Sequence, residues 1–282
     1  MRKILIFILF IGFNHNLYSV KKNQNKTIDS LTIDMKVSVG LINTYFNDEN
    51  KLYFEISENL LGKELLVVTR LAQLPGDYAG YLNAGSKTAE HVVQFEKHAK
   101  KILLKEVCFT NISDEEDPIS LSVAVNNFKP ILGAFDIKNS EDNRYLIDVS
   151  GYFMSDSPGF NIIRSYEKDN YKMGGVDKKR SFIDSARSFP RNIEILHTLT
   201  FSVNKAPRGN RTKSFSFQIN HSIIALPDDP MPVRYEDERV GWFTLNKINY
   251  SSEKLKSDSY NIVRKWRLEP SDIDAYNRGE LV

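Results

Sequence analysis

The stretch from Ile193 to Val203 reads IEILHTLTFSV, and the stretch from Phe215 to Ile223 reads FSFQINHSI. In each stretch every second residue is apolar, except for a single histidine on the same face, and the intervening residues are mostly polar. A period of two with one apolar face predicts a strand that lies on a core. A polar, turn-rich connection at residues 204–212 joins them, so the two strands predict a long antiparallel hairpin.

Similar β-rich runs precede this hairpin. Two of them flank a polar turn at residues 47–50, and two more flank a turn at residues 97–100, so each pair predicts a further hairpin. The β-rich runs are residues 40–46, 51–56, 64–74, 91–96, 101–109, 133–138 and 145–154.

Helical signals are short by comparison. Residues 57–63 fit one helical turn that begins at Ser57 and ends at Gly62, and residues 271–279 begin with a pattern like a capping box. The charged segment 165–180 predicts a long solvated loop. We therefore expect a mainly β protein built from antiparallel, sandwich-like sheets with a few short helices.

The composition is that of an ordinary globular protein. The chain has 282 residues, of which 41% are hydrophobic and 26% charged, so it can bury a full core. Basic residues number 38 and acidic residues 36. This near balance provides no electrostatic basis for binding nucleic acid or an anionic membrane surface.

The N-terminus has the features of an export signal. Arg2 and Lys3 precede an apolar run from Ile4 to Phe13, which is too short to span a bilayer but suits the apolar region of a signal peptide. We expect a signal peptide at residues 1–19, with cleavage near Ser19 and an uncleaved signal-anchor as the alternative. The protein would then be exported, either to the periplasm or outside the cell, with no transmembrane segment after cleavage.

The rest of the chain divides by composition. Residues 20–32 are polar and predict a mobile lead. Residues 33–75 predict a small N-terminal β-hairpin module, and residues 76–282 a main β-rich domain. The single cysteine, Cys108, excludes an internal disulfide and is interpreted as a small buried apolar residue. A thiolate that blocks a zinc site is the alternative.

The histidines do not supply a protease-type zinc site. A zinc-binding HExxH helix needs two histidines four positions apart, and no pair in this chain has that spacing. If the central hairpin closes over residues 204–212, His197 and His221 lie opposite or diagonal to each other on one face. They could hold a metal, although zinc requires further ligands and their neighbours are apolar. The alternative is a pair of core histidines.

A dense cluster of charged residues follows Pro230 and Pro232 and lies in a predicted ordered loop that crosses between elements. Arginine and carboxylate groups there could clamp an adjacent domain through bidentate pairs. They could instead bridge to one another at the surface, where each pair contributes little. The candidate docking residues are Arg234, Asp237, Arg239 and Trp242.

This loop, LPDDPMPVRYEDERVGWF at residues 226–243, resembles a signature of large bacterial secreted zinc-dependent metalloproteases. Shorter segments in the same order resemble other parts of that family's N-terminal accessory region, a domain of unknown function. These segments are 53–56, 60–62, 65–66, Arg70, 180–183, 189–190, 192–194, 221–222, 266–270 and 278–281.

The resemblance implies a β-rich region that precedes a catalytic domain with an HExxH helix. This chain ends about where that domain would begin, and it lacks the family's zinc ligands. We therefore expect a truncated or separately encoded, non-catalytic module that scaffolds or docks a protease domain in cis or in trans. Zinc would belong to that domain, and this chain would need no cofactor of its own.

Two other functions stay open. One is a stand-alone β domain outside the cytoplasm that binds a polypeptide or a glycan, which exposed aromatic residues would support. The other is an enzyme whose site is not visible in the sequence, for which only the His197 and His221 pair offers a starting point. The substrate, the oligomeric state and the role of Cys108 do not follow from the sequence.

Overall fold

A computed structural model describes residues 27–76, 78, 82–207, 209–252, 256–266, 268, 270 and 272–280. The predicted signal peptide at residues 1–19 and the first part of the polar lead lie outside the described residues. Among the described residues, no helix is both long enough and apolar enough to cross a membrane.

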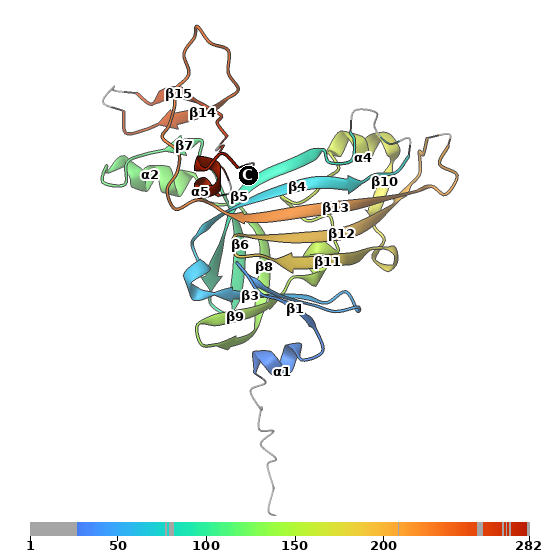
Figure 1. The fold of residues 1–282 in the computed structure, drawn as a ribbon. Coiled ribbons are helices and arrows are strands. Elements are labelled where there is room, and N and C mark those ends of the chain that lie inside the picture. Colours follow the sequence, from blue (N-terminus) through green and yellow to red (C-terminus); the bar gives the residue numbers. More distant parts are fainter. Residues whose placement is uncertain are drawn as a thin grey trace, which may run out of the picture.

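The fold is mainly antiparallel β with short helices, as the sequence predicts (Figure 1). Twelve strands form one sheet: β1 (Lys36–Ser38), β2 (Asn43–Phe46), β3 (Leu52–Ser57), β4 (Glu64–Gln73), β5 (Lys87–His98), β6 (Lys101–Val107), β8 (Ile131–Glu141), β9 (Arg144–Asp148), β10 (Met173–Val176), β11 (Phe182–Ser188), β12 (Asn192–Val203) and β13 (Ser214–Ala225). Three further strands form a small sheet: β7 (Asn111–Ile112), β14 (Thr244–Asn249) and β15 (Asp258–Val263).

The helices described are short and connect strands or cover their ends. The α-helices are α1 (Ile28–Thr32), α2 (Ile119–Asn126), α3 (Ser150–Phe153), α4 (Ser165–Tyr171) and α5 (Ile273–Asn277), and the 3₁₀ helices are η1 (Glu58–Leu60) and η2 (Lys178–Arg180).

The predicted central hairpin is confirmed as β12 and β13. The two strands pair antiparallel over their whole length, and β4 pairs with the other side of β13. Along both strands the expected apolar face is buried, because alternate side chains of a strand point to the same side. Strands β1 to β3, from the predicted N-terminal module, join this sheet through β9.

The large sheet curls on itself and is nearly closed, so that its inner faces meet across one interior as the layers of a sandwich do. At the seam, the segment after β1 meets the end of β11. The Leu41 amide donates to the Phe189 carbonyl at 2.8 Å, and the Ser188 amide donates to Ser38 Oγ, also at 2.8 Å. A Cβ on Gly40 would lie 2.5 Å from the Phe189 carbonyl oxygen, so the close approach at this seam requires glycine.

The interior of the curled sheet holds two apolar clusters. The larger one joins β3, β4, β5, β6, β9 and β12 with helix α3, and includes Phe54, Phe95 and Phe153. The second lies toward the other end of the central hairpin and includes Phe201, Phe215 and Phe217. Buried aromatic side chains of this size make up much of the apolar area that stabilises the fold.

The segment 165–180 differs from the expected solvated loop. It forms α4, β10 and η2, and Glu167 of α4 is almost fully buried. The Glu167 carboxylate accepts hydrogen bonds from the Tyr78 hydroxyl at 2.9 Å and from the Arg164 amide at 3.1 Å. The many charged residues of this segment suggested that it is solvated. The burial of Glu167 is possible because its carboxylate is hydrogen-bonded.

Two smaller expectations also differ from the structure. Cys108 is exposed and not buried, because β6 ends one residue earlier and the chain leaves the sheet there. Residues 28–32 of the polar lead form helix α1, whose Ile28 is buried against Tyr45 and Leu146.

The small sheet, α2, α5 and the loop between β13 and β14 gather at one end of the molecule, away from α4 and β10 (Figure 1). We call residues 109–130 and the described part of residues 226–280 the lobe. Residues 226–243 form no regular strand, as expected. Hydrogen bonds order this loop: the Glu236 amide donates to the Asn261 carbonyl at 3.0 Å, and the Val263 amide donates to the Arg234 carbonyl at 2.8 Å.

Candidate functional site

The candidate docking residues of the loop form two separate pairs. Arg239 binds the Asp237 carboxylate through two side-chain nitrogens, at 2.9 and 2.6 Å. This hydrogen bonding from the Arg239 side chain lowers the pKa of Asp237 to about 2. Arg234 instead lies over the ring of Trp242, with its guanidinium carbon 5.2 Å from the ring centroid. Asp237 and Arg239 therefore satisfy each other, whereas Arg234 and Trp242 present a cation and an aromatic surface.

The lobe has almost no apolar interior. Among its described residues, only Val263 and Ala275 are buried apolar side chains. In contrast, 16 of the 23 large apolar side chains that are exposed in the described structure lie in the lobe, and Phe243 is 80% exposed. Exposed apolar residues concentrated in one region are typical of an interaction surface.

Helix α2 illustrates this property of the lobe. Its sequence is ISLSVAVN, yet none of its residues is buried. Leu121 and Val125 are 75% and 79% exposed, and Phe128, just after the helix, is 73% exposed. A helix of this length is unstable alone in water, and none of its apolar side chains is buried against the rest of the described chain.

A groove of about 660 Å³ lies between the lobe and the outer face of the large sheet. Its floor is the cross-strand pair Leu66 on β4 and Val92 on β5. Arg234 of the loop and residues 264–266, which follow β15, line the opposite wall. The groove therefore joins the candidate loop to a second segment, whose cations Arg264 and Lys265 the sequence analysis did not single out.

His197 and His221 come together inside the large sheet, diagonal to each other across β12 and β13, as expected. Their Nε2 atoms lie 2.8 Å apart, and His221 Nδ1 lies 2.9 Å from Thr69 Oγ1. Both rings are almost fully buried and are surrounded by the rings of Phe153 and Phe160. The pair thus occupies the apolar interior, away from the groove and the lobe.

Burial dominates the protonation of this pair. Desolvation lowers the pKa of His197 to about 3 and lowers the pKa of His221 well below its usual value. Both rings are therefore neutral at neutral pH. If the Thr69 hydroxyl donates to His221 Nδ1, then His221 Nε2–H donates to His197 Nε2, and the His197 proton resides on Nδ1, which has no hydrogen-bond partner among the described residues.

This geometry leaves no position for a metal ion between the two rings. Zinc binds imidazole nitrogen at about 2.0–2.1 Å in tetrahedral geometry, which would require the two Nε2 atoms to separate. Among the described residues, no group of three or more histidine, cysteine, aspartate or glutamate side chains could hold a metal ion. In this arrangement the pair acts as a hydrogen-bonded element of the core.

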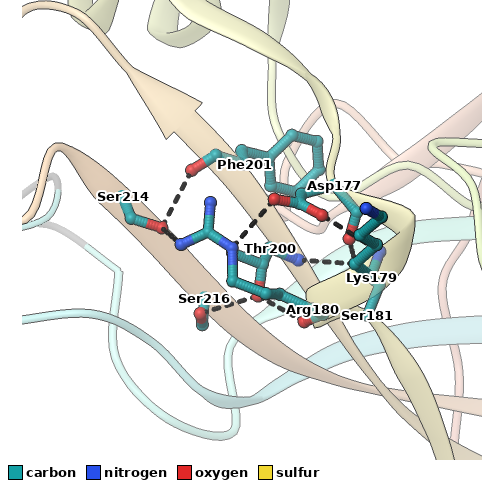
Figure 2. A network of polar contacts seen from close by, with 8 residues as sticks. All are labelled: Asp177, Lys179, Arg180, Ser181, Thr200, Phe201, Ser214 and Ser216. Carbon is teal, nitrogen blue, oxygen red and sulfur yellow. Dashed lines mark hydrogen bonds and ion pairs between the residues drawn. The ribbon is translucent and has the colours of Figure 1, made fainter.

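A polar network joins the connection between β10 and β11 to the central hairpin (Figure 2). Arg180 donates through Nε to the Asp177 carboxylate at 2.8 Å and through Nη1 to Ser214 Oγ at 3.1 Å. Ser181 Oγ accepts from the Thr200 amide at 3.0 Å. Arg180 lowers the pKa of Asp177 through this hydrogen bond. Because its partners belong to the chain itself, this network holds the connection between β10 and β11 against the central hairpin.

Fold and surface together define a β-rich protein with a tightly filled, nearly closed sheet and an apolar, weakly buried lobe. Residues 85–271 match the family model described as domain of unknown function DUF5117, and the chain belongs to that family. Residues 25–74 match a second model, described as domain of unknown function DUF5118. Strands from both matched regions share the large sheet.

One curated relative is the tRNA (guanine(6)-N2)-methyltransferase of Methanocaldococcus jannaschii. The two sequences are 25% identical over 142 residues, which cover 48% of this chain and 35% of the relative. The chain therefore spans about a third of that relative's length. No solved structure matches the chain significantly.

Proposed function

We propose that this protein is a non-catalytic docking module whose lobe binds a partner domain. The concentration of exposed apolar side chains on the lobe carries this proposal, together with the near absence of buried apolar residues beneath them. Covering such a surface with a partner would remove apolar area from water and would supply the core that the lobe lacks.

The resemblance of residues 226–243 to the accessory region of secreted zinc metalloproteases suggests what the partner is. In this proposal the partner is a metalloprotease catalytic domain, in cis or in trans, and zinc belongs to that domain. The protein would act outside the cytoplasm, in the periplasm or beyond the cell, in keeping with the export signal expected at residues 1–19. The loop with that resemblance lies within the exposed lobe.

The proposal can be tested with the full chain and a catalytic domain with an HExxH motif, encoded in the same genome and supplied in trans. Phe243→Asp and Leu121→Asp place a charge on the lobe at exposed positions, so they should weaken binding about tenfold or more without lowering stability. Val39→Asp is the matched control, since Val39 is 73% exposed but lies outside the lobe. Isothermal titration calorimetry measures the affinity.

The absence of binding by any such domain, or an equal loss of binding in Val39→Asp, would contradict the proposal. The second candidate function, a stand-alone module that binds a polypeptide or a glycan, is supported by the groove and by Trp266, which is 74% exposed beside it. Saturable binding of a neutral oligosaccharide, with a change in tryptophan fluorescence, would favour the glycan form of this alternative.

A further inference from the structure

The groove between the lobe and the large sheet has a chemical character of its own. Its floor, Leu66 and Val92, is aliphatic, and Met231 and Ile262 add aliphatic surface to walls that also carry charged side chains. Its volume of about 660 Å³ falls within the range of sites that hold a small ligand or a short peptide. An aliphatic lining of this kind favours aliphatic side chains over sugar hydroxyl groups, which would lose hydrogen bonds to water there.

The charge around the groove is one-sided. Its lining includes the cations Lys87, Arg234, Arg264 and Lys265, but only one carboxylate, that of Glu90. Lys87 and Glu90 form an ion pair with each other, so the two charges largely cancel. This leaves Arg234, Arg264 and Lys265 as the charges that a ligand would meet.

These three cations have few internal partners. Neither arginine forms an ion pair within the part of the chain that the structure describes, and Arg234 instead lies over the Trp242 ring. Lys265 donates to the carbonyl of Pro232, which brings no negative charge. Arg234 has a carboxylate, that of Asp237, in its neighbourhood, but Arg239 already binds that group through two nitrogens. Guanidinium groups without a paired carboxylate, at the rim of an aliphatic floor, are complementary to carboxylates.

We infer that the groove binds a short extended polypeptide segment in which aliphatic side chains alternate with carboxylates. The aliphatic side chains would lie on the Leu66 and Val92 floor, and the carboxylates would meet Arg234, Arg264 and Lys265. Trp266, exposed beside these cations, would cover one end of the segment. This inference rests on the proposed docking function and assigns the segment to the docked partner.

The probe is a fluorescein-labelled, eight-residue peptide that alternates glutamate and leucine, measured by fluorescence anisotropy with the full chain. We expect saturable binding below 1 mM that weakens as sodium chloride increases from 0.05 to 0.5 M, because the charges at the rim are exposed. The same peptide with lysine in place of glutamate should not bind.

Two variants test the cations directly. Arg264→Glu and Lys265→Glu should each weaken binding of the glutamate peptide about tenfold, because each replaces attraction by repulsion. Lys100→Glu, at an exposed position in the turn between β5 and β6, is the matched control and should leave binding unchanged. Thermal unfolding of the three variants verifies that each one is folded.

Several outcomes would overturn the inference: no saturable binding at 1 mM, equal binding of the lysine peptide, unchanged binding in both groove variants, or an equal loss in Lys100→Glu. Displacement of the peptide by a neutral oligosaccharide would assign the groove to a glycan. Self-association of the chain in the absence of peptide, measured by sedimentation, would assign it to a second copy of the chain. If the peptide fails but a catalytic domain still binds in a manner that depends on Phe243, only this inference fails. If the peptide binds and no catalytic domain does, the proposed function fails.

Discussion

Acidification from pH 7.5 to pH 5.0 should destabilise this protein through its buried histidine pair. His197 and His221 are neutral in the folded state, because desolvation lowers the pKa of each ring. In the unfolded chain both rings return to a pKa of about 6.5. The unfolded state then binds more protons than the folded state, so the free energy of unfolding decreases as the pH falls below about 6.5.

The magnitude follows from the pKa of His197, which is about 3 in the folded state. Linkage between a folded pKa near 3 and an unfolded pKa near 6.5 gives a loss of about 2 kcal/mol at pH 5.0 relative to pH 7.5. His221 acts in the same direction. This loss is a substantial fraction of the ~5–15 kcal/mol that stabilises a typical domain.

Urea unfolding of the full chain, followed by circular dichroism at pH 7.5, 6.0 and 5.0, measures the effect. The range is informative because carboxylates with ordinary pKa values titrate below it. A double variant, His197→Leu/His221→Leu, should remove most of the pH dependence, whereas His98→Gln, at the exposed end of β5, should retain it. A free energy of unfolding in the native protein that stays constant within 0.5 kcal/mol over this range would refute the buried neutral pair.

Three further perturbations have defined expected results. Gly40→Ala should lower the free energy of unfolding by about 2 kcal/mol, because the added Cβ would lie 2.5 Å from a backbone oxygen at the seam. The control in the same urea assay is Gly151→Ala, where no described atom lies within 4 Å of the added carbon. Glu55→Ala should lower the free energy of unfolding by about 3 kcal/mol, since this buried carboxylate accepts hydrogen bonds from Tyr45 at 2.6 Å and from Arg144 at 3.2 Å. An unchanged urea midpoint would contradict this. Cys108 should react with one equivalent of a thiol reagent in the folded protein, because it is exposed, and the absence of reaction before unfolding would contradict its placement.

The central hairpin was predictable because its information is local. Alternation along residues 193–203 and 215–223 identifies the buried face, and a short polar connection sets the pairing. The diagonal approach of His197 and His221 follows from that pairing alone. The ordered but strandless loop at residues 226–243 follows from its prolines, which cannot donate to a sheet ladder.

The closure of the sheet was not predictable from the same evidence. It joins Leu41 to Phe189 through a backbone hydrogen bond and Ser188 to the hydroxyl of Ser38, and neither contact leaves a hydrophobic pattern in the sequence. The burial of Glu167 depends on Tyr78, which is distant in sequence, and composition alone therefore suggested a solvated segment. The groove combines residues of β4 and β5 with the loop before β14 and the segment after β15, so it exists only once these elements have assembled.

The two parts of the molecule satisfy opposite physical requirements. In the large sheet the buried polar side chains have partners in most cases, such as His221 with Thr69 and Glu167 with Tyr78, and aromatic residues fill the interior. The lobe has ordered backbone hydrogen bonds but almost no apolar interior among its described residues. Hydrogen bonds that are accessible to water contribute little net stability, so the lobe should open at a lower free energy than the sheet.

A partner that covers the lobe would therefore slow hydrogen exchange in β14 and β15 far more than in β12 and β13. Protection that increased equally in both sheets would instead indicate that the partner acts on the molecule as a whole.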